Sequence, residues 1–147
     1  MLDTYRIRTR IKEIRKRLTI LNKYFQHLPE DKLTRDERLN AEAERHLQIA
    51  IQASLDIANH IVAALGLDRP AKETSEAFYS LASEGIIPDK FVNNMVKITG
   101  YRNILVHGYL DVDRHQTYIN IQKHLSDLSV FAKHIENFLE KRNHKSQ

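Results

Sequence analysis

Apolar residues recur every three or four positions along the first part of the chain. The series is Ile7, Ile11, Ile14, Leu18, Leu21, Phe25 and Leu28, with no step missed. This spacing places all of these side chains on one face of an α-helix. The pattern therefore predicts an amphipathic helix over residues 5–28.

The same periodicity returns in the rest of the chain and predicts four more helices, over residues 34–66, 74–84, 88–107 and 114–142. Thr34 to Glu37 has the spacing of a capping box, which is typical of a helix start. The 147 residues include only four Gly and three Pro, which favours long helices over a β fold. We predict an all-α, antiparallel bundle of about five helices in a single domain, residues 1–142. The tail, residues 143–147, is expected to be disordered.

Composition narrows the classes of function. The chain has no cysteine, which excludes disulfides, a thiolate zinc site and a cysteine nucleophile, and favours a cytoplasmic location. No signal peptide and no apolar run of about eighteen residues is found, so no membrane association is expected. The net charge of +4 and the pI of about 9.3 favour a polyanionic partner, although the charge alone is weak evidence.

The polar faces of the first helix are strongly basic. They carry Arg6, Arg8, Arg10, Lys12, Arg15, Lys16, Arg17 and Lys23, against only Asp3 and Glu13. A solvated helix face and a surface that contacts an RNA backbone explain this pattern equally well.

Several familiar sites are excluded by inspection, because the chain has no Gly-rich phosphate loop, no His-Glu-x-x-His and no Gly-x-Ser-x-Gly. Asp111, Asp113 and His115 alternate as metal ligands sometimes do, but a turn with a helix cap at Asp113 explains them better. We therefore predict neither a metal site nor a cofactor.

The segment from Tyr101 to Tyr109 has the highest density of chemically capable side chains. On a helix, Asn103 and His107 share a face, whereas Arg102 stands about 140° from His107, so only a long arginine side chain reaches the histidine's side. Gly108 is suited to end the helix, which places His107 beside the negative end of the helix dipole and favours its protonated form. A cationic histidine next to an arginine attracts phosphate.

Here the chain resembles the HEPN ribonucleases, and more closely the HepT-like toxins, whose motif is Arg, four residues, His, any residue, Tyr. Arg102, His107 and Tyr109 match the motif, and Asn103 is polar as in that family. Weaker similarity covers residues 44–48, 56–60 and 127–128, so the resemblance spans most of the chain.

The resemblance implies a toxin that cleaves RNA without a metal ion, by attack of a ribose 2′-hydroxyl on the adjacent phosphorus. Arg102 would stabilise the transition state and Asn103 would orient the phosphate or the histidine ring. His107 would transfer protons, but one histidine cannot be acid and base at once, which argues for a homodimer with two facing motifs.

The resemblance also implies a partner, an MNT-type nucleotidyltransferase antitoxin that transfers AMP from ATP to the hydroxyl of Tyr109. Two other interpretations stay open. In the first, the chain is a non-catalytic nucleotide- or RNA-binding accessory subunit of a nucleotidyltransferase. In the second, it is a helical interaction protein. From the residues alone, Arg102 could instead pair with a carboxylate, His107 cap a helix and Tyr109 pack in the core.

Overall fold

The computed structural model describes residues 1–67, 75–107 and 113–146, apart from the side chains of residues 106–107 and 145–146. Within these ranges the chain forms seven α-helices and one short 3-10 helix, and no strand. The all-α prediction is confirmed. The predicted number of about five helices is too low. The predicted break after Pro29 contains a helix, and the last predicted helix is divided into two.

The first helix, α1 (Thr4–Tyr24), buries the predicted apolar stripe, and the side chains of Ile7, Ile14 and Leu21 are fully inaccessible. Its N-cap is Asp3, whose carboxylate accepts a hydrogen bond from the backbone N–H of Arg6 at 3.0 Å. The backbone N–H of Asp3 in turn donates to Nε2 of His60, at 2.9 Å, which ties the start of α1 to a later helix.

The expected break after Pro29 contains a short helix, α2 (Glu30–Arg35). Pro29 precedes it in an extended conformation, Glu30 and Asp31 in its first turn complement the helix dipole, and Leu33 is fully buried. The long helix α3 (Glu37–Ala64) follows, and its N-cap is Asp36, whose side chain accepts from the N–H of Leu39. The predicted start at Thr34 is therefore wrong by two residues.

Glycines end two of the helices, as predicted. Gly66 follows α3 with a φ of 65°, and Gly85 follows α4 (Glu76–Ser83) with a φ of 73°. Both values lie in the left-handed region that glycine adopts without a steric penalty. After Pro88 the chain makes one 3-10 turn, η1 (Asp89–Phe91), and continues directly into α5 (Val92–His107), which is unbroken at Gly100.

The last predicted helix is two helices, α6 (Arg114–Lys123) and α7 (Leu125–Ser146). The break falls at His124, whose backbone leaves the helical region and whose ring contacts Oδ2 of Asp127 at 3.1 Å. Asp113 caps α6 by accepting from the N–H of His115, which confirms the predicted cap. α7 continues beyond Arg142 to Ser146.

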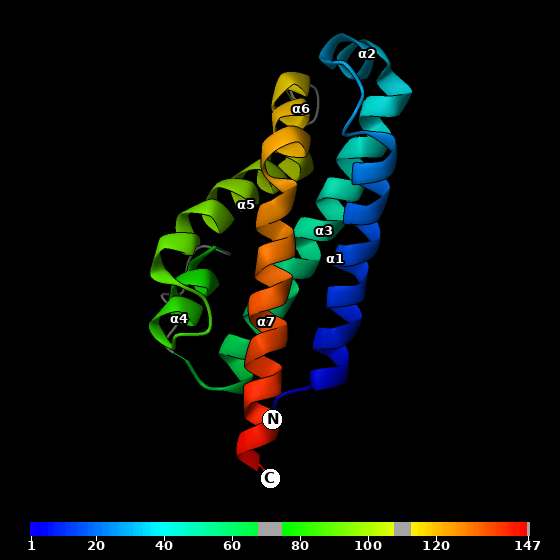
Figure 1. Ribbon diagram of the computed structural model, residues 1–147. Helices are drawn as coiled ribbons and strands as arrows, with labels where there is room; N and C mark the ends of the chain where they lie inside the picture. The colour runs from blue at the N-terminus through cyan, green and yellow to red at the C-terminus, as the bar shows by residue number, and fades with distance from the viewer. Residues whose placement is uncertain (68–74, 108–112, 147) are drawn as a thin grey trace.

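The long helices α1, α3, α5 and α7 run in alternating directions around one core, with α4 beside α5 and with α2 and α6 at one end of the bundle (Figure 1). The two chain ends lie together at the opposite end. Among the described residues, no helix is both long enough and apolar enough to cross a membrane. This arrangement places the end of α5 next to the middle of α3, where the candidate site lies.

Candidate active site

Tyr101 anchors the last part of α5 in the core. Its side chain is only 4% exposed, and its hydroxyl lies 2.6 Å from Oγ1 of Thr117, which is buried on α6. Burial raises the pKa of Tyr101 far above the usual tyrosine value, so the phenol stays neutral. On the helix, Arg102 stands about 100° and Asn103 about 200° from the inward-facing Tyr101, and both residues are half-buried.

Arg102 is a cation with no acidic partner among the residues that the structure describes. Its Nη1 donates to Oδ1 of Asn103 at 3.1 Å, and its buried Nε has no hydrogen-bond partner there. The alternative in which Arg102 pairs with a carboxylate is thus not seen in the described part of the chain. A half-buried guanidinium in this situation is suited to bind an external anion.

His107 is the last residue of α5, and the structure describes only its backbone. Because α5 is helical throughout, His107 stands one turn beyond Asn103 on the same helical face, as the spacing predicts. Gly108, Tyr109 and Asp111 lie outside the described residues. The geometry of the motif is therefore established for Arg102 and Asn103 and for the helix that leads to His107.

Arg102 also lines a cleft of about 380 Å³, which we call the α1–α3 cleft. Arg10 of α1 and Arg45, Gln52 and Asp56 of α3 line it as well. Nε of Arg10 lies 3.3 Å from one carboxylate oxygen of Asp56, and Nε2 of Gln52 donates to the other at 2.9 Å. These residues form no recognisable site motif in the sequence, although Arg45 and Asp56 belong to the segments with weaker family similarity.

The other histidines have structural partners or lie away from this cleft. His115 contacts Glu30 of α2, and Asp111 of the suggested metal set lies outside the described residues. His46 contacts Nη1 of Arg17 at 3.1 Å, and burial together with the Arg17 charge lowers the pKa of His46. Within the described ranges, no group of three or more His, Asp or Glu side chains is arranged to hold a metal ion.

The basic residues of α1 fall into two sets. Arg10, Arg15 and Arg17 form ion pairs with Asp56, Glu136 and Glu13, respectively. An outer set has exposed side chains and no ion pair among the described residues: Arg6, Arg8, Lys12, Lys16 and Lys23.

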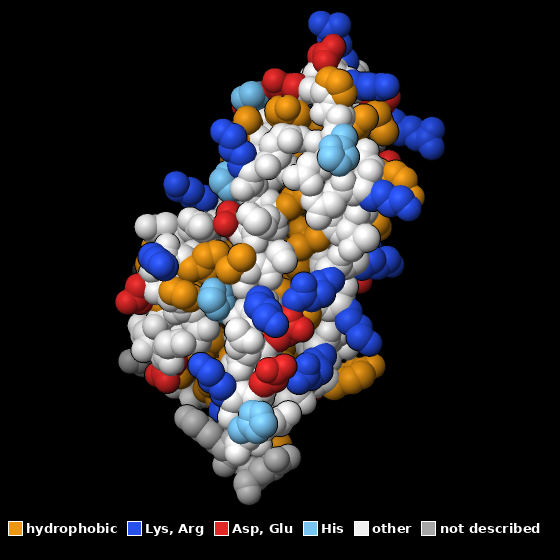
Figure 2. All heavy atoms as spheres, viewed as in Figure 1, with side chains coloured by type: hydrophobic (Ala, Val, Ile, Leu, Met, Phe, Trp, Pro, Cys, Tyr) orange, Lys and Arg blue, Asp and Glu red, His pale blue; other side chains and the backbone are white. Residues whose placement is uncertain are grey.

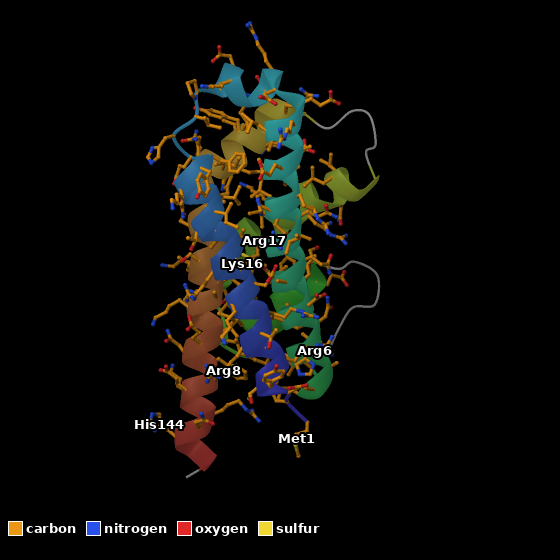
Figure 3. The ribbon with its side chains drawn as sticks, turned by 90° about the vertical axis from the view of Figure 1, so that its right-hand side faces the viewer. Met1, Arg6, Arg8, Lys16, Arg17 and His144 are labelled. Atoms are coloured by element: carbon orange, nitrogen blue, oxygen red, sulfur yellow. The ribbon has the colours of Figure 1, made fainter. Side chains whose placement is uncertain are left out.

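The pictures show both sets. Lys and Arg side chains follow one edge of the molecule, over α1 (Figure 2). In Figure 3, Arg6 and Arg17 lie on the side of α1 toward α3, and Arg8 lies toward α7. Most of the basic side chains of α1 therefore face solvent, whereas Arg10 lines the α1–α3 cleft.

A helical bundle whose penultimate long helix ends in an Arg-Asn…His segment defines the HEPN class of ribonuclease. The family model described as "Ribonuclease HepT-like" matches residues 14–135, and the chain belongs to this family. The resemblance inferred from the sequence is thereby confirmed, as is the ribonuclease class of enzyme.

Individual relatives agree with this assignment. The tRNA nuclease HepT of Aphanizomenon flos-aquae is 29% identical over 132 residues, which are 86% of this chain and 89% of the relative. The mRNA nuclease HepT of Shewanella oneidensis is 34% identical over 86 residues, 58% of this chain and 64% of the relative.

A solved structure extends the similarity to the fold. It contains a tri-AMPylated HEPN toxin of Shewanella oneidensis in complex with an MNT antitoxin. The toxin is 27% identical to this chain with a TM-score of 0.81, and the match covers 93% of this chain and 99% of that one.

Proposed function

We propose that this protein is the toxin of a toxin-antitoxin system and an endoribonuclease that cuts RNA without a metal ion. The observation that carries the proposal is the guanidinium of Arg102, half-buried and without an acidic partner in the described residues, on the helix that ends at His107. Relatives named as tRNA and mRNA nucleases support RNA as the substrate class.

The chemistry divides between two kinds of group. The neutral imidazole of one His107 takes the proton of a ribose 2′-hydroxyl, whose oxygen attacks the adjacent phosphorus. The bond from phosphorus to the 5′-oxygen breaks, a cyclic phosphate forms, and a protonated His107 from a second copy of the chain gives its proton to the leaving oxygen. Arg102 stabilises the charge that develops on the phosphorane oxygens, and Asn103 holds the guanidinium or the phosphate in place.

We further propose that an MNT-type nucleotidyltransferase is the antitoxin and transfers AMP to the hydroxyl of Tyr109. The tri-AMPylated relative bound to its MNT antitoxin supports the partner class and the type of modification. Tyr109 stands two residues beyond His107, so an attached AMP adds phosphate charge beside Arg102 and His107. The adduct would pair with the cations and exclude the RNA phosphate.

The first experiment is cleavage of RNA by the purified protein in the presence of EDTA. We expect full activity with the chelator, and a loss of at least about a hundredfold in both His107→Ala and Arg102→Ala, because each removes a group that acts in the transition state. Lys133→Ala, which removes an exposed cation of α7, is the matched control and should cleave like the wild type.

Wild-type activity in either site variant contradicts the assignment of these residues. Loss of activity with EDTA and its rescue by a divalent ion would place the protein in another class of nuclease. Nucleotide binding without any cleavage would favour the accessory-subunit alternative.

A further inference from the structure

The α1–α3 cleft has an unbalanced set of charges. Five charged side chains line it: the cations Arg10, Arg45 and Arg102 and the carboxylates Glu13 and Asp56. Both carboxylates are already paired, Asp56 with Arg10 and Glu13 with Arg17. Arg45 and Arg102 have no ion-pair partner in the described part of the chain, so the cleft has two guanidinium groups available to an anion.

Gln52, one of the residues that line the cleft, has an oriented hydrogen-bond acceptor. The amide nitrogen of Gln52 donates to Asp56, which fixes the orientation of the amide group. Its oxygen Oε1 is buried and has no hydrogen-bond partner in the described residues. Buried polar atoms of this kind are uncommon in native proteins, and a partner for this one has to be a donor.

These groups together select a class of ligand. A bare phosphate matches the two arginines, but its dianion has a single O–H with which to reach Gln52 and fills only part of the cleft. A nucleotide matches both, because its phosphates accept hydrogen bonds from arginine and its ribose hydroxyl or base amino groups donate. The volume of about 380 Å³ lies at the small end of the range for ligand pockets, which suits one nucleotide unit.

We propose that the α1–α3 cleft binds the nucleotide of the RNA strand that adjoins the phosphate held by Arg102. Arg45 contacts a flanking phosphate and Gln52 accepts a hydrogen bond from the base or the ribose. The inference rests on the proposed function, because Arg102 links the cleft to the cleavage site. Because a dinucleotide has only the phosphate held by Arg102, the contact of Arg45 with a flanking phosphate makes a longer RNA strand the preferred substrate.

The test measures binding of fluorescent RNA to the His107→Ala protein, which should not cleave it. We expect a hexanucleotide to bind more tightly than a dinucleotide. Arg45→Glu should weaken hexanucleotide binding by at least about tenfold and leave dinucleotide binding nearly unchanged, because it removes a charge-assisted hydrogen bond and repels the phosphate. Gln52→Met, similar in length but without the amide, should weaken hexanucleotide binding by a smaller factor.

Lys133→Glu is the control for the change in charge, because it reverses an exposed cation on α7, which lies across α1 from α3 in Figure 3. Circular dichroism checks that each variant is folded. If Arg45→Glu and Lys133→Glu bind the hexanucleotide alike while the wild type cleaves RNA, the cleft assignment is wrong and the proposed function stands.

Free AMP is the second arm of the test. If AMP alone binds as tightly as the hexanucleotide and Arg45→Glu abolishes both, the cleft is a site for a free nucleotide, which overturns the proposal. If the wild type does not cleave RNA at all, the proposed function fails whatever the binding data show.

Discussion

Two neighbouring residues at the end of α5 have opposite surroundings, and this contrast creates the candidate site. Tyr101 is buried and bonded to Thr117, whereas Arg102 is half-buried with Asn103 as its hydrogen-bond partner. The neutral tyrosine fixes the rotation of the helix, and the helix then fixes the direction of the arginine. A guanidinium held in this way loses less conformational entropy when a phosphate binds.

At the residue scale, the sharpest prediction concerns Tyr109. Incubation with an MNT-type nucleotidyltransferase and ATP should add AMP to the wild-type protein and abolish its RNase activity. Tyr109→Phe should remain unmodified and active under the same conditions, because it lacks the accepting hydroxyl. Intact-mass spectrometry and RNA cleavage measure the two effects on one sample.

The control for this experiment is Tyr79→Phe, which removes a half-exposed tyrosine hydroxyl from α4. It should be modified and inhibited like the wild type. AMP adducts on the Tyr109→Phe protein in the same number as on the wild type would place the modification on other residues.

At the scale of the helix, α1 has a feature that opposes its own stability. Arg8, Lys12 and Lys16 are exposed and spaced four residues apart, so each faces a like charge one turn away. A helix that served only to cover the core would gain from acidic residues at these positions. This observation favours binding of an anion by the outer face of α1, but it does not identify the anion.

We predict that Lys12→Glu stabilises the protein, because it replaces two repulsive pairs by two attractive ones. Helix propensity is nearly equal for Lys and Glu, so we expect a gain of about 0.5 to 1 kcal/mol in the free energy of unfolding. Urea denaturation at low salt measures the gain, and about 1 M NaCl should remove most of it. Lys12→Gln, which only removes the repulsion, should have a stability between those of the wild type and Lys12→Glu. An unchanged or lower stability of Lys12→Glu would show that the like charges do not repel appreciably.

The helices that the sequence predicted well are those with a continuous apolar stripe and a clear stop, such as α1 and the C-terminal end of α3 at Gly66. The two errors that changed the number of helices arose where the local sequence pattern was insufficient. α2 is a six-residue helix that depends on the burial of Leu33, and the break at His124 interrupts an apolar series that continues on both sides. Both depend on tertiary contacts, which periodicity does not report.

At the scale of the whole molecule, the candidate site draws on residues that are far apart in the chain. The motif from Arg102 to Tyr109 could be identified from the sequence because it is local. The α1–α3 cleft could not, because Arg10, Gln52 and Arg102 come together only when α1 and α5 both pack against α3. The polar residues of such a cleft look like ordinary surface residues until the packing is known.

The last prediction concerns the number of chains in the active unit. If each cut requires His107 from two copies, a dimer with one His107→Ala subunit is inactive. In equal mixtures with random pairing at constant total protein, activity should then fall to about one quarter of the wild-type value, because that fraction of dimers has two intact subunits. Independent sites would leave about one half. Co-expression of differently tagged copies allows the subunits to mix, native mass spectrometry counts the mixed dimers, and mixing with Lys133→Ala in place of His107→Ala should leave activity unchanged. A linear dependence on the wild-type fraction, or a monomer at the assay concentration, would rule out the shared site and require a second proton-transfer group within one chain.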